Sequence, residues 1–342
     1  MKSYLISSTK KSSGKTIIAT GISSILSRTD SLAVFKKGPD YIDPYWLSLA
    51  SKVNCYNLDF FTMSNSEIKK LYKQMSYEKN ISIIEGNKGL FDGISLDGGD
   101  SNASLAHLLK LEVILVIDCV GMTRGVAPLL KGYQEFDKKI KYKGIILNNI
   151  ANDRHENKVI NAINEFTKLK VIGSIHKNKQ LTIMEKKLGL EPVFQNPYTK
   201  NIIKNISSVI KKSVDMKYLI NKKTNNKDNK IPKVVLKKHI YSNLRIGVAF
   251  DSAFGFYYPD DINEFKRLGA KIIYFDTLKD KVLPKVDGLF IGGGFPERVA
   301  DKLTKNTRMI KSISNYIESE MPVYAECGGL MYLCNSIITK TN

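Results

Sequence analysis

The sequence predicts an α/β protein made of two successive parallel-sheet domains. Over roughly the first 150 residues, short runs rich in Val, Ile and Leu alternate with helical patterns, as expected for a sheet that helices cover on both faces. A polar, Lys- and Asn-rich stretch interrupts this alternation at residues 221–243, and the alternation then resumes. We therefore expect one domain at 1–220 and another at 244–342, joined by a linker at 221–243.

The expected strands are short apolar segments bounded by polar or glycine-containing turns. In the first domain they are 3–7, 31–36, 81–86, 113–118, 144–149 and 170–175. In the second domain they are 245–251, 271–276, 288–293 and 322–327. Because parallel strands end along one edge of their sheet, the loops that follow them are where ligands are expected to bind.

Composition indicates a globular protein with a strong positive charge. The 342 residues are 43% hydrophobic and carry a formal net charge of +20. No apolar run approaches the ~20 residues of a membrane span, and the N-terminal segment lacks the apolar stretch of a secretory signal. We expect a cytoplasmic protein without a membrane partner. The four cysteines form no CxxC pair, so neither a zinc site nor a disulfide framework is indicated.

The positive charge has two open interpretations. Lysine is spread over the whole chain and mixed with Asn and Ile, as in a compositional bias. A positive cleft would instead attract anionic small molecules. No nucleic-acid-binding motif accompanies the charge, so we expect no nucleic-acid partner.

A phosphate-binding loop is predicted near the N-terminus. The segment "SSTKKSSGKT" (7–16) follows the first expected strand and precedes a helical run, which is the context that a P-loop requires. Gly14 and the loop N–H groups would bind the phosphates of ATP, Lys15 would reach the β- and γ-phosphates, and Thr16 would bind Mg²⁺. Thr9 stands where the first glycine of the usual GxxxxGK[ST] pattern belongs.

Acidic residues follow three of the expected strands. They are Asp40 and Asp43 in "FKKGPDYIDP" (35–44), Glu85 and Asp92 in "IIEGNKGLFDG" (83–93), and Asp118 in "VIDCVGMTRG" (116–125). Carboxylate oxygens at the carboxyl ends of parallel strands are ligands that Mg²⁺ prefers. Beside a P-loop they predict an ATP- and Mg²⁺-dependent enzyme, but they do not name its acceptor.

These segments resemble a known family. In this order after a GKT loop, "FKKGPDYIDP", "EGNKGLFDG" and "DCVGMTRG" resemble the cobyrinic acid a,c-diamide synthase family. The later segments "DSAFGFYYPDDINEFKRLGA", "GLFIGGGFPE" and "PVYAECGGLMYL" resemble its class I glutamine amidotransferase domain. The resemblance covers nearly the whole chain. It implies a dethiobiotin-synthetase-like ATP domain followed by a partial, flavodoxin-like amidotransferase domain.

The resemblance implies a ligase of cobalamin biosynthesis. The family amidates the a and c acetate side chains of cobyrinic acid, a corrin-type polycarboxylate, with ATP and with glutamine or ammonia. An acceptor carboxylate takes the γ-phosphoryl group, and ammonia then displaces phosphate from the acyl phosphate. The implied roles are metal binding by Thr16, Asp43 and Glu85, catalysis by Asp40, Tyr41, Asp43 and Asp92, and adenine contact by Asn148.

The second domain is expected to carry a cysteine nucleophile. Cys327 lies at the predicted strand-to-helix turn of "PVYAECGGLMYLC" and matches the family's glutaminase cysteine. The N-terminus of the following helix would lower the pKa of its thiol. The N–H groups of Gly293 and Gly294, in a run that starts at Gly292, are the expected oxyanion donors. We expect Cys334, further into the helix, to belong to the core.

The histidine that the family uses as a general base, downstream of the cysteine, has no counterpart here. The histidines of the sequence are His107, His155, His176 and His239. We therefore expect a C-terminally truncated glutaminase whose missing strands leave an exposed apolar edge. Three explanations stay open: a broken or incomplete reading frame, which we favour; a homodimer or a separate chain that completes the domain; and an enzyme that runs on free ammonia.

Rival interpretations concern the acceptor and the class of protein. The same amidation could act on another tetrapyrrole such as nickel sirohydrochlorin, or on other corrinoid side chains, or the truncated chain could be inactive. In a different class, a partner-regulated P-loop ATPase of the partitioning kind would place Lys10 at the position of that group's signature lysine. Absorbance changes with each macrocycle, and hydrolysis that depends on a partner, would discriminate among them.

Overall fold

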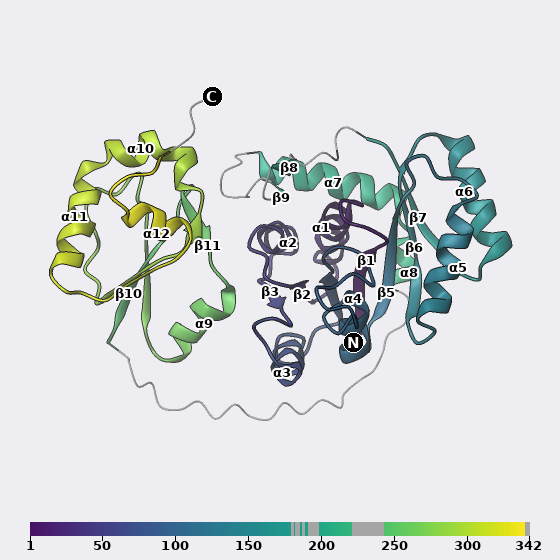
Figure 1. Ribbon diagram of the computed structural model, residues 1–342, viewed down its shortest axis with the longest axis horizontal. Helices are drawn as coiled ribbons and strands as arrows, with labels where there is room; N and C mark the ends of the chain where they lie inside the picture. The colour runs from purple at the N-terminus through teal and green to yellow at the C-terminus, as the bar shows by residue number, and fades with distance from the viewer. Residues whose placement is uncertain (179–180, 182–184, 187–188, 191–197, 221–242, 339–342) are drawn as a thin grey trace. The chain divides into compact units, whose positions relative to one another are not determined.

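The structure is a computed structural model that describes residues 1–178, 181, 185–186, 189–190, 198–220 and 243–338. The chain divides into two compact units, Met1–Pro232 and Lys233–Asn342. Each unit has its own parallel sheet with helices packed on it, which confirms the predicted fold class (Figure 1). The linker expected at 221–243 lies outside the described residues except for Asn243, so the predicted domain limits stay a prediction.

The first unit is built on a seven-stranded parallel sheet in the order β3-β2-β4-β1-β5-β6-β7. Its strands are β1 (Lys2–Ser8), β2 (Leu32–Lys37), β3 (Cys55–Leu58), β4 (Ile81–Glu85), β5 (Glu112–Asp118), β6 (Lys141–Ile150) and β7 (Val171–His176). All except β3 coincide with expected segments. The sequence pattern missed β3 because its four residues, CYNL, are too few and too polar to form a recognisable apolar run.

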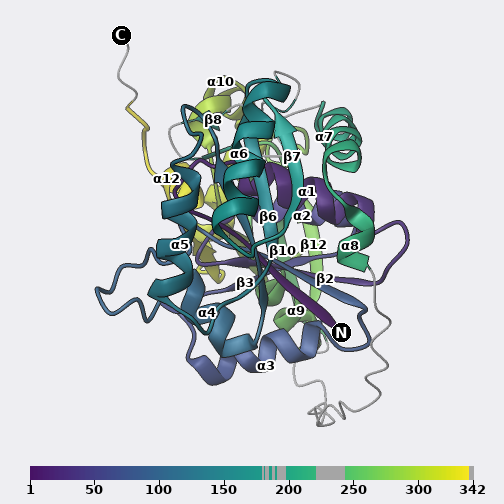
Figure 2. The same ribbon diagram turned by 90° about the vertical axis from the view of Figure 1, so that its right-hand side faces the viewer.

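Helices pack on both faces of this sheet. They are α1 (Lys15–Leu26), α2 (Asp43–Ser51), α3 (Asn65–Met75), α4 (Asn102–Leu109), α5 (Val126–Phe136), α6 (Asp153–Phe166), α7 (Thr199–Ser213) and α8 (Met216–Ile220). Helix α1 contacts both α2 and α7, whereas α3 contacts α4 and α5 contacts α6; Figure 2 shows α6 and α7 on opposite sides of the strands. Gly21 permits the close approach of α1 and α7, because a Cβ there would lie 2.4 Å from Ile210 Cγ1. Two covered faces explain the apolar strands.

The second unit has a four-stranded parallel sheet in the order β12-β10-β13-β15. Its elements are β10 (Arg245–Ala249), β11 (Phe254–Phe256), α9 (Pro259–Arg267), β12 (Lys271–Phe275), β13 (Gly288–Ile291), β14 (Gly293–Gly294), η3 (Pro296–Val299), α10 (Ala300–Lys305), α11 (Thr307–Glu318), β15 (Val323–Ala325) and α12 (Gly328–Leu333). The strand expected at 288–293 divides into β13 and β14, and β14 pairs antiparallel with β11. Phe254, Phe275, Ile291 and Met309 belong to its core.

The first unit also contains a small two-stranded sheet. The short strands β8 (Glu185–Lys186) and β9 (Gly189–Leu190) pair antiparallel in the first unit. Among the described residues, the helices are too short or too polar to cross a membrane.

Candidate functional site

The first unit contains a cavity of about 580 Å³ at the carboxyl ends of its central strands. The P-loop between β1 and α1 lines one part of it. The ends of β2, β4, β6 and β7, with the loops that follow, supply the rest. This is the edge of the sheet at which the sequence placed the phosphate loop and the acidic residues.

The P-loop is held in shape by contacts that only glycine allows at position 14. Gly14 has φ 88°, in the left-handed region, and caps α1. A Cβ there would lie 2.3 Å from Asn148 Nδ2. That same amide donates to the carbonyl of Ser13 at 2.9 Å, so Asn148 braces the loop while it lines the cavity. Lys15 is nearly buried, and its Nζ donates to Ser8 Oγ at 2.9 Å.

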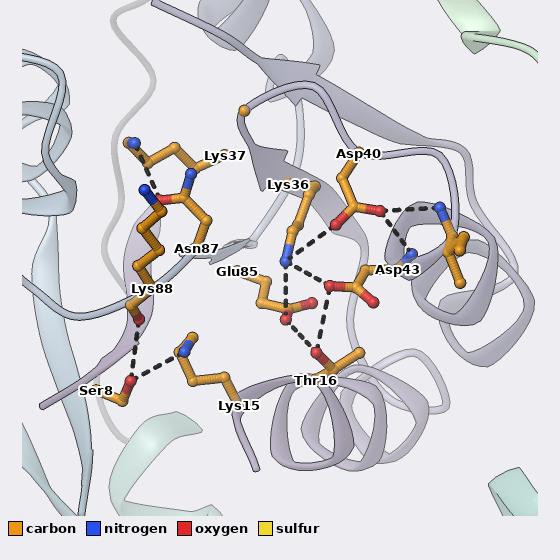
Figure 3. A network of polar contacts seen from close by, with 12 residues as sticks. Ser8, Lys15, Thr16, Lys36, Lys37, Asp40, Asp43, Glu85, Asn87 and Lys88 are labelled. Atoms are coloured by element: carbon orange, nitrogen blue, oxygen red, sulfur yellow. Dashed lines mark hydrogen bonds and ion pairs between the residues drawn. The ribbon is translucent and has the colours of Figure 1, made fainter. Parts of the chain in front are cut away.

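A buried lysine that the sequence analysis did not select lies at the centre of the acidic residues. Lys36 Nζ lies 2.6 Å from Asp43 Oδ2, 3.0 Å from Glu85 Oε1 and 3.7 Å from Asp40 Oδ2. Thr16 Oγ1 donates to Glu85 Oε1 at 2.5 Å and lies 3.3 Å from Asp43 Oδ2. Figure 3 shows these side chains pointing toward one another. The fold therefore brings Thr16, Asp40, Asp43 and Glu85 together, and we call these residues with Lys36 the Lys36 cluster.

Burial and mutual attraction oppose one another in the Lys36 cluster. Burial raises the pKa of Glu85 to about 7, although Lys36 acts in the opposite direction. Burial alone would lower the pKa of Lys36, but Asp43 and Glu85 outweigh it and raise that pKa well above its usual value. Burial would likewise raise the pKa of Asp43, yet Lys36 holds it below its usual value. Lys36 therefore stays charged and acts as the counter-ion of the cluster.

Burial also acts on two neighbouring groups. It raises the pKa of Asp40, against the opposing effect of Lys36. It lowers the pKa of Lys15 to about 8, with Glu85 acting in the opposite direction. Both groups are therefore poorly solvated, and perturbed pKa values of this kind are common at functional sites.

The donor set of the Lys36 cluster fits a magnesium ion. Glu85 is fully buried, and its Oε2 has no hydrogen-bond partner among the residues that the structure describes. A buried carboxylate oxygen of this kind is costly unless a further partner occupies it. Together with the Thr16 hydroxyl and the Asp43 carboxylate, it provides the hard oxygen ligands that Mg²⁺ prefers.

The remaining acidic residues predicted for the first unit have structural contacts outside the Lys36 cluster. Asp92 Oδ2 accepts from the Gly89 N–H at 2.8 Å and so fixes the loop after β4. Asp118 pairs with Lys10 at 2.9 Å, which ties the P-loop to the end of β5. A functional role for Asp92 stays a prediction.

Asp40 and Tyr41 lie in the turn that leads into α2. Asp40 Oδ1 accepts from the N–H groups of Ile42 at 2.8 Å and Asp43 at 3.0 Å. Tyr41 is half-buried in the same turn. The turn is therefore rigidly placed beside the cavity, which Asp40 lines.

Two buried asparagines support the site, and the sequence analysis missed both. Asn57 Nδ2, on β3, donates to the carbonyls of Gly38 and Asp40, each at 2.8 Å. Asn102 Nδ2, at the start of α4, donates to the Gly89 carbonyl at 2.8 Å. No local pattern marks these asparagines, because their partners lie far away in the sequence. Lys36, by contrast, stands inside "FKKGPDYIDP", and a lysine at a strand end among acids was a usable signal.

Cys327 in the second unit lies at a strained turn between β15 and α12. It has φ 49°, caps α12 and is exposed. The turn is packed against glycines: a Cβ on Gly329 would lie 2.0 Å from the Ile291 carbonyl oxygen, and one on Gly293 would lie 3.5 Å from Cys327 Cβ. Gly294 lies beside Gly328. The structure thus places Gly293 and Gly294 next to the cysteine, and their role as oxyanion donors stays a prediction.

The prediction for Cys334 was wrong. It is exposed rather than part of the core. Helix α12 ends at Leu333, so Cys334 leaves the helix with an extended backbone instead of continuing its buried face. Its Sγ donates to the Leu330 carbonyl at 3.3 Å.

The histidines of the first unit are engaged with other partners. His107 contacts Asp137 at 2.7 Å, His155 contacts the Met122 carbonyl at 2.6 Å, and His176 contacts Glu156 at 2.7 Å. His239 lies outside the described residues.

Comparison with known proteins connects both units to known families. Residues 245–342 match the model of the CobB/CobQ-like glutamine amidotransferase domain, and residues 39–185 match that of an AAA domain. The cobyrinate a,c-diamide synthase of Magnetococcus marinus is 39% identical over 97% of this chain and 73% of its own length. Those of Picrophilus torridus and Methanobrevibacter smithii are 40% and 38% identical, over 98% and 97% of this chain and 77% and 74% of theirs.

The match leaves part of these relatives uncovered. The chain spans about three quarters of their length.

Among solved structures, chloroplast FtsY from Physcomitrella patens has a TM-score of 0.39 at 11% identity, covering 60% of this chain and 65% of that chain. A likeness this weak supports no conclusion about function.

Proposed function

The chain belongs to the family of cobyrinate a,c-diamide synthases, and on this premise we propose that it amidates the a and c acetate carboxylates of cobyrinic acid at the expense of ATP. The observation that carries the proposal is the Lys36 cluster beside the P-loop. Lys15, the oxygen atoms of Thr16, Asp43 and Glu85, and the turn that starts at Asp40 line one cavity, which supports the proposal.

The first half-reaction is a phosphoryl transfer. A carboxylate oxygen of the acceptor attacks the γ-phosphorus of ATP, the bond to the bridging oxygen breaks, and ADP leaves an acyl phosphate behind. Lys15 stabilises the negative charge that develops on the transferred group. Thr16, Asp43 and Glu85 would hold Mg²⁺, which supplies further neutralisation of the phosphates when bound. Lys36 keeps Asp43 ionised, opposes the protonation of Glu85 and would hold both carboxylates beside that position.

The second half-reaction uses ammonia. Its nitrogen attacks the acyl carbon, the bond to the phosphate oxygen breaks, and the amide, inorganic phosphate and a proton are released. Asp40 and Tyr41, in the rigid turn before α2, would position the acceptor at this step.

The second unit would supply the ammonia from glutamine. Cys327 Sγ would attack the amide carbon, ammonia would leave with the thiol proton, and water would hydrolyse the thioester to glutamate. The exposed thiol and the strained backbone support this role, since both present the sulfur to a substrate. The sequence from 243 to 338 holds no histidine to act as the base, so the use of glutamine needs a direct test.

The experiment is ATP-dependent amidation of cobyrinic acid by the full chain, with glutamine and ammonium chloride in parallel and products identified by mass. Singly and doubly amidated products are expected with ammonium, with one ADP formed for each amide. Product with glutamine as well would indicate a base from elsewhere in the chain or from a partner. A further arm with nickel sirohydrochlorin checks the acceptor. ATP hydrolysis without amidation of any acceptor would overturn the proposal.

A further inference from the structure

Lys37, next to Lys36 in the sequence, is buried at the end of β2 without an acidic partner. Its exposed fraction is 4%, close to the 3% of Lys36. Its Nζ donates to Asn87 Oδ1 at 3.1 Å and lies 5.8 Å from the centre of the Phe60 ring. Among the described residues, no carboxylate lies within 4.0 Å of this ammonium group. Lys36 has three carboxylates at that distance.

The alternation of a strand explains this difference between neighbours. Successive side chains of β2 point to opposite faces of the sheet, so Lys36 faces the P-loop helix and Lys37 faces away from it. Two carboxylates influence Lys37 from a distance, Asp100 and Asp59. Both are already bound to nearby loops, because they accept from the N–H groups of Ile94 and Phe61 at 2.8 Å and 3.1 Å.

A buried ammonium group without a counter-ion is costly to the fold. Such a cost is commonly accepted where a ligand provides the missing charge. Lys88 increases the local positive charge, since it acts on Lys37 as a like charge and is itself exposed. Because the nearby carboxylates do not pair with Lys37, this corner of the site keeps an excess of positive charge.

Asn87 connects Lys37 to the cavity. Asn87 and Lys88 both line the cavity that the P-loop and the Lys36 cluster also line. Figure 3 shows Lys37, Asn87 and Lys88 gathered apart from Lys36 and its carboxylates. An anion in the cavity could therefore contact the Lys88 ammonium and the Asn87 amide directly, with the Lys37 charge behind them.

We propose that Lys37, Asn87 and Lys88 form a subsite for a carboxylate of the acceptor other than the one that is phosphorylated. This inference rests on the proposed function, in which the acceptor is a polycarboxylate. A carboxylate fits better than a phosphate of ATP, because Lys37 lies on the face of β2 that is turned away from α1 and the P-loop. The subsite would bind one carboxylate side chain of the macrocycle while another carboxylate of the same macrocycle reacts.

The test measures equilibrium binding of cobyrinic acid to the full chain in the absence of ATP. The visible absorbance of cobyrinic acid reports the binding. The variants are Lys37→Met and Lys88→Met, which keep an unbranched apolar stem and remove the charge. Lys69→Met, on the exposed face of α3, is the matched control. We expect each of the two subsite variants to weaken binding at least about tenfold, Lys88→Met through loss of a charge-assisted contact and Lys37→Met through loss of the charge behind it. The control should bind as the wild type does. The affinity for MgATP should change less than about twofold in all three.

The outcomes separate this subsite from the proposed function. A wild-type chain that does not bind cobyrinic acid overturns the acceptor assignment and the subsite with it. Wild-type binding that both subsite variants retain overturns the subsite alone. Variants that lose affinity for MgATP but keep it for cobyrinic acid would also overturn the subsite, since Lys37, Asn87 and Lys88 would then serve the nucleotide. If Lys37→Met does not fold, Lys88→Met decides, because its side chain is exposed.

Discussion

The two sites of this protein are both built where a parallel strand runs into a helix, but different parts of the chain hold them in place. In the first site, Lys15 donates to Ser8 of β1, and Thr16 meets Glu85 of β4 and Asp43 at the start of α2. Both carboxylates also pair with Lys36 of β2. Cys327 follows β15 at φ 49°, and Gly293 lies beside its side chain. The first site is a set of buried charges that compensate one another, and the second is a strained turn that presents one exposed thiol.

This difference predicts how each site responds to substitution. Removing one buried charge leaves its partners unpaired, so changes in the first site should affect both chemistry and folding. Replacing the exposed thiol leaves the backbone of the turn intact, so a change there should affect chemistry alone.

The largest effect is expected for Lys15→Ala. In the proposed mechanism the transferred phosphoryl group loses the charge of Lys15, so amidation with either nitrogen source should fall about 100- to 1000-fold or more. Initial rates of amide formation at saturating ATP measure this loss. A variant that is folded and has near-normal activity would sink the proposed phosphoryl transfer. Lys69→Ala, at an exposed position on α3, is the control.

Lys36→Met should show the coupling of chemistry and folding in the first site. Asp43 and Glu85 lose their counter-ion in a buried position, so we expect the free energy of unfolding to fall by about 3–5 kcal/mol at pH 7 without divalent cations. The loss should shrink toward pH 5. Burial already raises the pKa of Glu85 to about 7, so the folded form takes up a proton before the unfolded form does, and lower pH stabilises the fold.

Denaturant unfolding measures this change, and Lys37→Met is its matched control. The two residues are adjacent and equally buried, but Lys37 has no acidic partner within ion-pair distance among the described residues. We expect Lys37→Met to be no less stable than the wild type. Equal destabilisation by the two substitutions would show that burial, and not charge compensation, sets the response of this site.

Cys327→Ala should have the smallest effect. Ammonium-dependent amidation and the free energy of unfolding should stay at wild-type values, because the side chain is exposed and Ala tolerates φ 49° about as well as Cys does. Any glutamine-dependent turnover of the wild type should disappear. Parallel rates with the two nitrogen sources measure both effects. Loss of ammonium-dependent turnover in a folded variant would refute the separation of the two sites.

Local sequence patterns were sufficient for much of the fold and for the main site motifs. Apolar runs marked six of the seven strands of the first sheet, and the GKT loop marked the start of α1. They failed for β3, which is short, and for Cys334, which lies one residue beyond the end of α12 and is exposed. The first failure concerns an element too short to form a pattern, and the second concerns a helix end, which depends on packing against the rest of the chain.

The sequence by itself determined which residue types stand at the strand ends: the lysine of a GKT loop, several carboxylates and a cysteine at a turn. Only the tertiary structure decided how they pair. The strand order places β4 between β2 and β1, so Glu85 meets Lys36 and Thr16 although 49 and 69 residues separate them from it. The alternation of β2 turns Lys37, one residue from Lys36, to the other face, where the fold gives it the Asn87 amide as its partner. Strand order, and with it the partners that each side chain meets, is set by long-range packing, which no local pattern encodes.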